Sequence, residues 1–329
     1  MILNRKYWYY RRKLLGLLGL PVYSEPLHLD IEPTIRCNLR CRICQVPKWN
    51  RTCPDLSLDS FKKILNSAPY LKSIKLQGMG EPLLNKDFFE MVKLARLRDI
   101  KVSMHTNGTL LSDLNIQNLI ESQINEIAVS CDHYDPLILK NLRPGLNFES
   151  FSSGIMQLNK CASEIHVKAY SLLTLDLKEN IERHLDFLLV CNFKEIVLQP
   201  DITDWGGNYP ETSNSALSHE ELKEIKERVK EWSEKNDGTT IVFQKSRYSQ
   251  ESPCPWPFHY SYITADLYVQ PCSICTNPSI FNLGNLNHRN REFSGIWNRT
   301  AYFKFRDIFL NGKLPDFCRS CYAPVKGKP

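Results

Sequence analysis

Strands and helices alternate along the first two-thirds of this 329-residue chain. Short apolar or alternating segments each precede a longer segment with helical spacing, as Ser73 to Gln77 precedes Asp87 to Arg98. Six strands are predicted in this way, at residues 27–32, 73–77, 100–106, 124–130, 165–173 and 195–199. Strands separated by helices pair in parallel, because the crossover returns the chain to the same end of the sheet. The sequence therefore predicts an α/β domain on a parallel sheet.

Polar and glycine-rich segments follow the predicted strands at their carboxyl ends. They are Cys37–Cys44 after the first strand, Gly78–Pro82 after the second, His105–Gly108 after the third, Ser130–Asp132 after the fourth and Gln199–Asp201 after the sixth. In parallel α/β folds, ligands bind at the carboxyl ends of the strands. We therefore expect one ligand site at this edge of the sheet, with the turn-rich loop Asp201–Pro210 closing over it.

The first of these segments holds three cysteines, Cys37, Cys41 and Cys44, at the spacing C-x3-C-x2-C. A cuboidal iron–sulfur cluster normally takes four thiolates, so a loop that supplies three leaves one iron open to a ligand that is not protein. An open iron indicates chemistry at this site. The alternatives are a zinc ion with a distant fourth ligand, or three thiols in the core.

The spacing, with Asn38-Leu39-Arg40 between the first two cysteines, resembles the signature of the radical S-adenosylmethionine (SAM) superfamily. The resemblance implies a partial (β/α)6 radical SAM barrel, which six strands fit, whereas a closed barrel needs eight. It also implies a [4Fe-4S] cluster whose open iron is chelated by SAM. An electron, from a donor such as flavodoxin or ferredoxin, then cleaves SAM to a 5′-deoxyadenosyl radical, which abstracts hydrogen from a substrate C–H bond.

The segment Gly78-Met79-Gly80-Glu81-Pro82 resembles the GGEP segment of the family, with Met79 in place of the second glycine. In the family, backbone carbonyls of this segment and its glutamate accept hydrogen bonds from the ammonium group of SAM. A buried ammonium needs acceptors, which supports Glu81 as a cofactor-binding residue. The alternative for a Gly-x-Gly pair alone is an ordinary turn.

Weaker candidates for contact with SAM stand at the later strand ends. They are Asn107, Ser130, Asp132, Arg143 and Gln199. The resemblance implies that Asn107 and Ser130 face the methionine or ribose, and that Asp132 assists. Arg143 could pair with the SAM carboxylate. A purely structural role is the alternative for each. No catalytic acid or base is assigned.

The composition changes from residue 246, where prolines, aromatic residues and cysteines replace the strand–helix alternation. Two sets of metal ligands are possible in this C-terminal module. Cys272, Cys275, Cys318 and Cys321 form a CxxC…CxxC zinc-ribbon pattern. Replacing Cys275 by Cys254 gives a set that resembles Twitch, a shortened SPASM domain that holds one auxiliary [4Fe-4S] cluster.

We favour the Twitch-like set because the barrel before it already uses a cluster. Leu283-Gly284-Asn285-Leu286 and Ile296-Trp297 resemble further segments of that module, whereas Leu267 stands where a hairpin glycine is usual. The additional cysteines of a full SPASM domain are missing, so a second auxiliary cluster is not expected. The remaining thiols are predicted to be ordinary core or surface residues, with Cys131 closest to the expected SAM pocket.

The composition, with a net charge of +6, is that of an ordinary soluble protein and carries no nucleic-acid-binding signature. Twelve cysteines in metal-like spacings indicate a reducing, cytoplasmic location. There is no run of 18 apolar residues, so no membrane-spanning helix is predicted.

The predicted domains are a basic and aromatic N-terminal extension (residues 1–26), the barrel (27–245) and the Twitch-like domain (246–329). The extension mimics a signal peptide, but its apolar run, Leu14–Leu20, is short, contains two glycines and lacks a cleavage site. We expect a helix or arm packed on the barrel; the alternative is contact with a membrane surface or an anionic substrate.

From this resemblance we hypothesise that the chain is a radical SAM enzyme that carries out a two-electron oxidation of a sugar, aminocyclitol or similar small molecule. The rival hypothesis is a maturase that crosslinks or epimerises a ribosomally made peptide. Such enzymes often have an extra N-terminal peptide-binding domain, for which the residues before the first strand are too few. A non-catalytic zinc or iron–sulfur protein is the alternative from another class.

Overall fold

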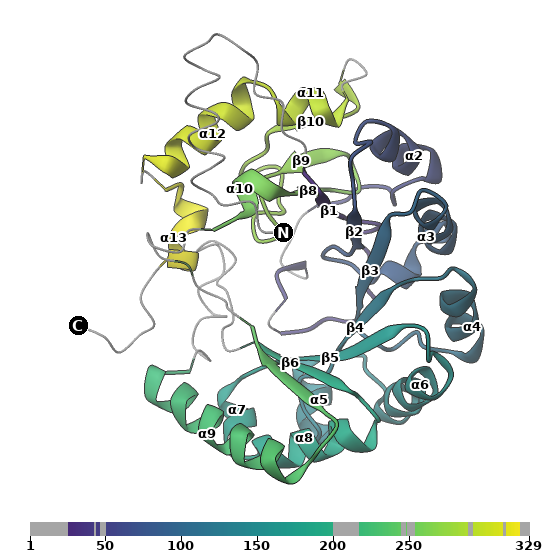
Figure 1. The fold of residues 1–329 in the computed structure, drawn as a ribbon, viewed down its shortest axis with the longest axis vertical. Coiled ribbons are helices and arrows are strands. Elements are labelled where there is room, and N and C mark those ends of the chain that lie inside the picture. Colours follow the sequence, from purple (N-terminus) through teal and green to yellow (C-terminus); the bar gives the residue numbers. More distant parts are fainter. Residues whose placement is uncertain are drawn as a thin grey trace.

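The computed structural model describes residues 26–42, 44–46, 51–199, 217–244, 248, 254–288, 292–311 and 314–322. In this part of the chain, ten strands form one sheet in the order β10-β9-β8-β1-β2-β3-β4-β5-β6-β7. The sheet curves around a central space, and the helices α2, α3, α4 and α6 cover its outer face (Figure 1). The predicted α/β class and the partial barrel are confirmed. The N-terminal extension, before residue 26, and the loop Asp201–Pro210 lie outside the described residues.

Seven neighbouring strands of the sheet run in parallel. They are β1 (His28–Ile31), β2 (Ser73–Leu76), β3 (Lys101–Thr106), β4 (Glu126–Ser130), β5 (His166–Leu172), β6 (Glu195–Gln199) and β7 (Thr240–Phe243). The first six match the six predicted strands. The seventh, expected only as a further strand, continues the barrel beside β6.

Helices connect these strands. They are α2 (Leu58–Asn66), α3 (Phe88–Arg96), α4 (Asp113–Glu121), α5 (Pro136–Leu142), α6 (Phe148–Cys161), α7 (Leu175–Lys178), α8 (Ile181–Val190) and α9 (His219–Lys235), with the short 3₁₀ helix η2 (Pro82–Leu84). Side-chain oxygens of Ser57 and Ser112 cap α2 and α4, and the capping box of Ser218 and Glu221 starts α9.

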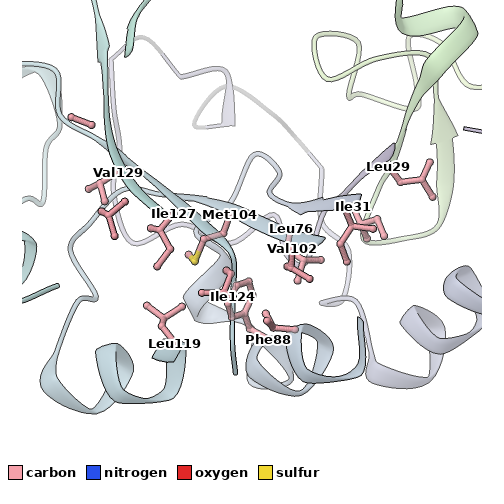
Figure 2. Packing of buried hydrophobic residues seen from close by; sticks show 14 of the residues in the cluster. Leu29, Ile31, Leu76, Phe88, Val102, Met104, Leu119, Ile124, Ile127 and Val129 are labelled. Carbon is pink, nitrogen blue, oxygen red and sulfur yellow. The ribbon is translucent and has the colours of Figure 1, made fainter. Parts of the chain in front are cut away.

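The apolar core lies between the sheet and the outer helices. Leu76 and Val102 are fully buried on adjacent strands, and Phe88 and Leu119 are buried on α3 and α4 (Figure 2). Successive side chains on a strand point to opposite faces. The residues between these core positions, such as Lys75 and Ser103, therefore face the inside of the barrel. This alternation sends the polar strand residues toward the central space.

The C-terminal module continues the same sheet. Its elements are α10 (Trp256–His259), β8 (Tyr260–Ile263), β9 (Tyr268–Gln270), β10 (Gly284–Asn285), α11 (Phe293–Trp297), α12 (Thr300–Leu310) and α13 (Asp316–Tyr322). Strand β8 pairs in parallel with β1, and β9 returns antiparallel to β8. The predicted hairpin is therefore present, but it also extends the barrel. The predicted boundary between residues 245 and 246 lies outside the described residues.

Leu267, which stands in the sequence where a hairpin glycine is usual, lies in the turn of this hairpin. Its φ is 69°, in the left-handed region that favours glycine. The side chain is nevertheless buried in the core, with 4% of its surface exposed. Burial of an apolar side chain thus offsets the backbone strain at this position. Within the described residues, no helix is long and apolar enough to cross a membrane.

Candidate active site

A cavity of about 620 Å³ opens at the carboxyl ends of the barrel strands and extends to the C-terminal module. All of the cofactor-binding and metal-ligand candidates from the sequence line it. They are Cys37, Cys41, Cys44, Gly78, Met79, Gly80, Glu81, Asn107, Ser130, Asp132, Arg143, Gln199, Cys254, Cys272, Cys318 and Cys321. The fold therefore brings together residues that span most of the chain at one cavity.

The three-cysteine loop between β1 and α2 is hydrogen-bonded to the last residue of α5 and to the segment just after it. The backbone N–H of Arg40 donates to Pro144 O at 3.1 Å, and that of Arg42 donates to Leu142 O at 3.0 Å. Asn107 contacts the loop from the end of β3, because its Nδ2 lies 3.7 Å from Cys37 Sγ and 2.9 Å from Asn38 Oδ1. These bonds hold the three thiols at the cavity wall.

The thiols in this loop need a positively charged partner to ionise. Burial raises the pKa of Cys41 to about 12, although the Arg143 guanidinium opposes the shift, and burial also raises the pKa of Cys44. A metal ligand must be a thiolate, and bound iron supplies the positive charge that stabilises it. Three cysteines facing one cavity therefore suit an iron–sulfur cluster with one iron left open.

The segment Gly78–Pro82 packs directly against the cysteine loop. A Cβ atom on Gly80 would lie 2.4 Å from the carbonyl oxygens of both Thr34 and Arg36, so only glycine fits there. The Glu81 N–H donates to Arg36 O at 2.8 Å. Close contact with the loop thus explains the glycine, and it places the backbone of this segment on the cavity.

The Glu81 carboxylate has partners within the chain that the sequence did not reveal. Its Oε1 accepts from the Thr106 hydroxyl at 2.9 Å, and its Oε2 accepts from the Asn107 N–H at 2.7 Å. Oε1 also accepts from the Leu83 N–H at 3.3 Å. Burial raises the pKa of Glu81 to about 7. This carboxylate therefore joins the ends of β2 and β3, whatever else it binds.

Arg143 and Asp132 form a buried ion pair at the end of β4. Arg143 Nε donates to Asp132 Oδ2 at 2.9 Å, its Nη2 also contacts that oxygen, and its Nη1 donates to Ser130 O at 2.9 Å. The Leu172 N–H donates to the other oxygen of Asp132 at 3.1 Å. The guanidinium on which we expected a SAM carboxylate thus already holds a carboxylate of the chain. Because Asp132 neutralises it, Arg143 offers a small ligand hydrogen-bond donors more than net charge.

The four cysteines of the Twitch-like set come from three parts of the C-terminal module. Cys254 precedes α10, Cys272 follows β9, and Cys318 and Cys321 lie on α13. All four line the cavity. Cys275 is buried and is not among the lining residues; its N–H lies 3.4 Å from Cys272 Sγ. Burial raises the pKa of Cys272 to about 12 and also raises that of Cys318, so both thiols would need a bound cation to ionise.

The other thiols lie away from the cavity. Cys131 and Cys191 are fully buried, Cys53 is half-buried and Cys161 is exposed. Although Cys131 is next to Asp132, it does not line the cavity. Within the described ranges, no three His, Cys, Asp or Glu side chains are grouped so that they could hold a single metal ion.

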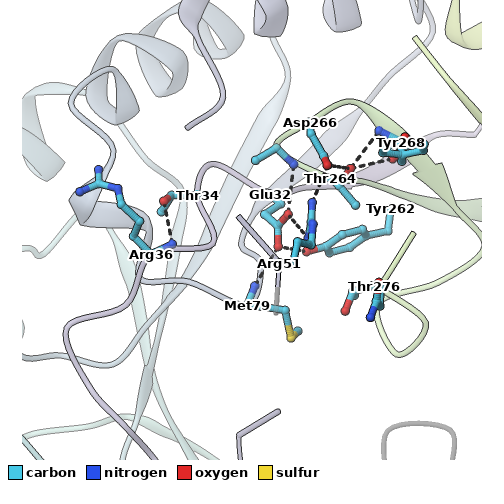
Figure 3. A network of polar contacts seen from close by, with 12 residues as sticks. Glu32, Thr34, Arg36, Arg51, Met79, Tyr262, Thr264, Asp266, Tyr268 and Thr276 are labelled. Carbon is cyan, nitrogen blue, oxygen red and sulfur yellow. Dashed lines mark hydrogen bonds and ion pairs between the residues drawn. The ribbon is translucent and has the colours of Figure 1, made fainter. Parts of the chain in front are cut away.

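A buried polar network beside the cavity was not predicted from the sequence. Glu32, at the end of β1, accepts from the Tyr262 hydroxyl at 2.9 Å, from the Met79 N–H at 3.2 Å and from the Ala265 N–H at 3.1 Å. Arg51 contacts both Glu32 and Asp266 (Figure 3). In the sequence, Glu32 only continues the alternation of polar and apolar residues from His28 to Ile31, which does not indicate its partners.

Two family models match the chain. The model of the radical SAM superfamily matches residues 31–188, and the iron–sulfur cluster-binding SPASM model matches residues 254–322. The chain is therefore a member of the radical SAM superfamily with a C-terminal SPASM/Twitch module. Membership implies a [4Fe-4S] cluster, SAM and additional iron–sulfur chemistry in the C-terminal module.

Curated relatives match with different coverage. The tungsten-containing aldehyde ferredoxin oxidoreductase cofactor-modifying protein of Pyrococcus furiosus is 38% identical over 108 residues, which are 32% of this chain and 30% of that protein. The chain thus matches less than a third of that relative's length. The PqqA peptide cyclase of Gluconobacter oxydans is 24% identical over 310 residues, covering 91% of this chain and 83% of the cyclase.

Among solved structures, Streptococcus suis SuiB bound to its precursor peptide SuiA superposes with a TM-score of 0.71. The identity is 16%, and the match covers 92% of this chain and 72% of SuiB. At this identity the likeness concerns the fold alone. It extends over the barrel and the C-terminal module together.

Proposed function

We propose that this chain is a radical SAM dehydrogenase that removes two electrons from a C–H-bearing small molecule such as a sugar or aminocyclitol. One observation carries the proposal: both cysteine sets line a single cavity, and polar strand residues such as Asp30, Lys75 and Gln77 line it as well. A site with both sets allows hydrogen abstraction at one end and electron removal at the other. When bound, SAM and the first cluster would supply the abstracting radical, and the auxiliary cluster would accept the second electron.

The assigned roles follow from the positions of the residues. Cys37, Cys41 and Cys44 would hold the SAM cluster, because three thiols leave an open iron. Cys254, Cys272, Cys318 and Cys321 would hold the auxiliary cluster with four thiolates and no open iron. The Gly78–Pro82 backbone and Asn107 would orient SAM beside the first cluster. The Arg143–Asp132 pair and Ser130 lie on the same wall and would complete that pocket.

Peptide modification is the second candidate function, because two relatives favour it. The PqqA peptide cyclase matches most of this chain, and SuiB was solved with a precursor peptide. A crosslink within a peptide would also remove two hydrogen atoms, so the same pair of cysteine sets could serve that reaction. Polar strand residues on the cavity favour the small-molecule substrate, because a few placed polar groups can bind the hydroxyls of a sugar or aminocyclitol.

Anaerobic reconstitution with iron and sulfide tests the proposed function. The loaded protein should contain about eight irons per chain, as two [4Fe-4S] clusters require. With SAM and dithionite it should form 5′-deoxyadenosine, and the triple variant with Cys37, Cys41 and Cys44 changed to Ala should form none. Deoxyadenosine from the triple variant would remove the assignment of the cluster.

The reaction type is tested with myo-inositol, glucosamine and their phosphate monoesters as substrates. A product two mass units lighter, formed in step with deoxyadenosine, is the expected outcome. A ribosomal peptide that loses two mass units while these compounds stay unchanged would favour the maturase. Zinc in place of iron after reconstitution would contradict both the dehydrogenase and the maturase hypotheses.

A further inference from the structure

Polar side chains on the barrel strands line part of the cavity that the two cysteine sets share. On β1 and β2 the inward residues that line the cavity are His28, Asp30, Lys75 and Gln77. Register explains their proximity, because Asp30 and Lys75 are direct partners across the β1–β2 pair. Apolar residues fill the inward positions of many barrels, where they pack as a core. A polar wall on a cavity indicates that something polar binds against it.

Lys75 is a cation of this wall with no hydrogen-bond or ion-pair partner among the described residues. It lines the cavity and forms no hydrogen bond or ion pair in the part of the chain that the structure describes. Asp30 is its nearest acidic neighbour, but the Asp30 oxygens already accept from His28 Nε2 at 2.8 Å and from Gln77 Nε2 at 3.0 Å. The ammonium group therefore has donors to offer to a ligand.

The other charges near Lys75 are already paired. Lys168, on β5, lies 2.7 Å from Glu126 on β4. Burial lowers the pKa of Lys75, Lys168 lowers it further, and Asp30 and Glu126 oppose the shift. A partly buried ammonium without a carboxylate in contact is costly to keep charged. An anionic group of a ligand would remove that cost.

Strands β3, β5, β6 and β7 bring neutral hydrogen-bonding groups to the same cavity. The Tyr170 hydroxyl contacts both Gln199 and Gln244, on the ends of β6 and β7. His105 packs edge-on against Tyr170, with ring centroids 4.7 Å apart, and burial lowers the pKa of His105. Amide, phenol and neutral imidazole groups suit hydroxyls of a ligand, because each can donate or accept.

We propose that this wall is the substrate subsite, and that it binds a hydroxyl-bearing small molecule through a carboxylate or phosphate group held by Lys75. The identification of the ligand as substrate rests on the proposed function, whereas the binding of an anion at Lys75 does not. Gln77 and the amides around Tyr170 would contact the hydroxyls. The substrate would thus lie in the cavity that both cysteine sets line.

Calorimetric titration of the anaerobically reconstituted protein tests the subsite. The probes are inorganic phosphate, glucose 6-phosphate and glucose. Glucose 6-phosphate should bind at least tenfold more tightly than glucose, and inorganic phosphate should compete with it. Lys75→Gln should weaken glucose 6-phosphate binding at least tenfold, whereas Lys75→Arg should retain most of it. Lys72→Gln is the matched control, because Lys72 is exposed just before the same strand and should change nothing.

Equal binding of glucose and glucose 6-phosphate, no binding of either anion, or unchanged binding in Lys75→Gln would each overturn the proposal. Circular dichroism of each variant shows whether it is folded. If Lys75→Gln does not fold, Lys75→Arg is the variant that still tests the proposal. An acidic peptide forms the second arm: binding that depends on Lys75 for the peptide but not for glucose 6-phosphate would overturn the small-molecule ligand. These titrations use no turnover, so a protein that fails to cleave SAM can still pass them.

Discussion

The Tyr262 hydroxyl donates a hydrogen bond of 2.9 Å to the Glu32 carboxylate, although 230 positions separate the two residues. Glu32 is fully buried at the end of β1, and Tyr262 belongs to β8 of the C-terminal module. The same carboxylate accepts from the Met79 N–H. One buried group thus ties the segment that is expected to bind SAM to the module that is expected to hold the auxiliary cluster.

Removing the hydroxyl in Tyr262→Phe should destabilise the protein by about 1–3 kcal/mol, because the buried Glu32 carboxylate loses a donor and gains none. Urea denaturation of wild type and variant gives this difference as a change in the free energy of unfolding. Tyr70→Phe is the control, since Tyr70 is 64% exposed and its change should stay within about 0.5 kcal/mol. Equal stability of all three proteins would show that the contact between barrel and module does not depend on this bond.

Gly80→Ala should disrupt the contact between the Gly78–Pro82 segment and the cysteine loop. The added Cβ would meet two backbone carbonyls, which cannot rotate away, and overpacking of this kind costs about 1–3 kcal/mol. SAM affinity, measured by equilibrium dialysis, should fall at least tenfold. Gly295→Ala is the matched control, because its new Cβ meets nothing closer than 3.9 Å. If Gly80→Ala binds SAM as wild type does, the close packing is not needed for the site.

Glu81 should make stability fall as the pH rises from about 4.5 to about 7. Burial raises the pKa of Glu81 to about 7 in the folded protein, from an ordinary value of 4.5 in the unfolded chain, so the folded state holds the proton more tightly. The resulting stabilisation is fully present below about pH 4.5 and is lost as the pH passes 7, by up to about 3 kcal/mol. Urea denaturation at several pH values should show this slope in wild type and a flatter one in Glu81→Gln. Parallel pH profiles for the two proteins would contradict the shift.

Cys254→Ala should cost the protein one cluster, about four irons per chain, because Cys254 lines the cavity with Cys272, Cys318 and Cys321. Cys275→Ala should retain both clusters, since Cys275 is buried away from the cavity lining. Iron content and the visible absorbance of the two reconstituted variants provide the comparison. The reverse pattern would favour the zinc-ribbon pairing of Cys272, Cys275, Cys318 and Cys321.

Local sequence patterns were enough to predict the strand–helix order and the cysteine loop. The period of the apolar residues depends only on near neighbours along the chain, so it identified the six strands and the helical spacing between them. Polar residues just after the strands indicated the edge of the sheet where ligands bind. The family resemblance rested on spacing within eight residues, which no distant contact alters.

Only the tertiary structure decided which distant residues meet. The alternation on β2 predicts that Lys75 and Leu76 face opposite sides, but it does not say that Lys75 lies beside Asp30 in the register of β1 and β2. Likewise, no local pattern shows that β8 pairs with β1, that Tyr262 reaches Glu32, or that Thr106 and Asn107 engage Glu81. Strand pairing and burial depend on contacts between segments far apart in the sequence, so their free energy becomes specific only when the whole sheet has formed. The sequence by itself determined the type of site, and the assembled sheet determined what surrounds it.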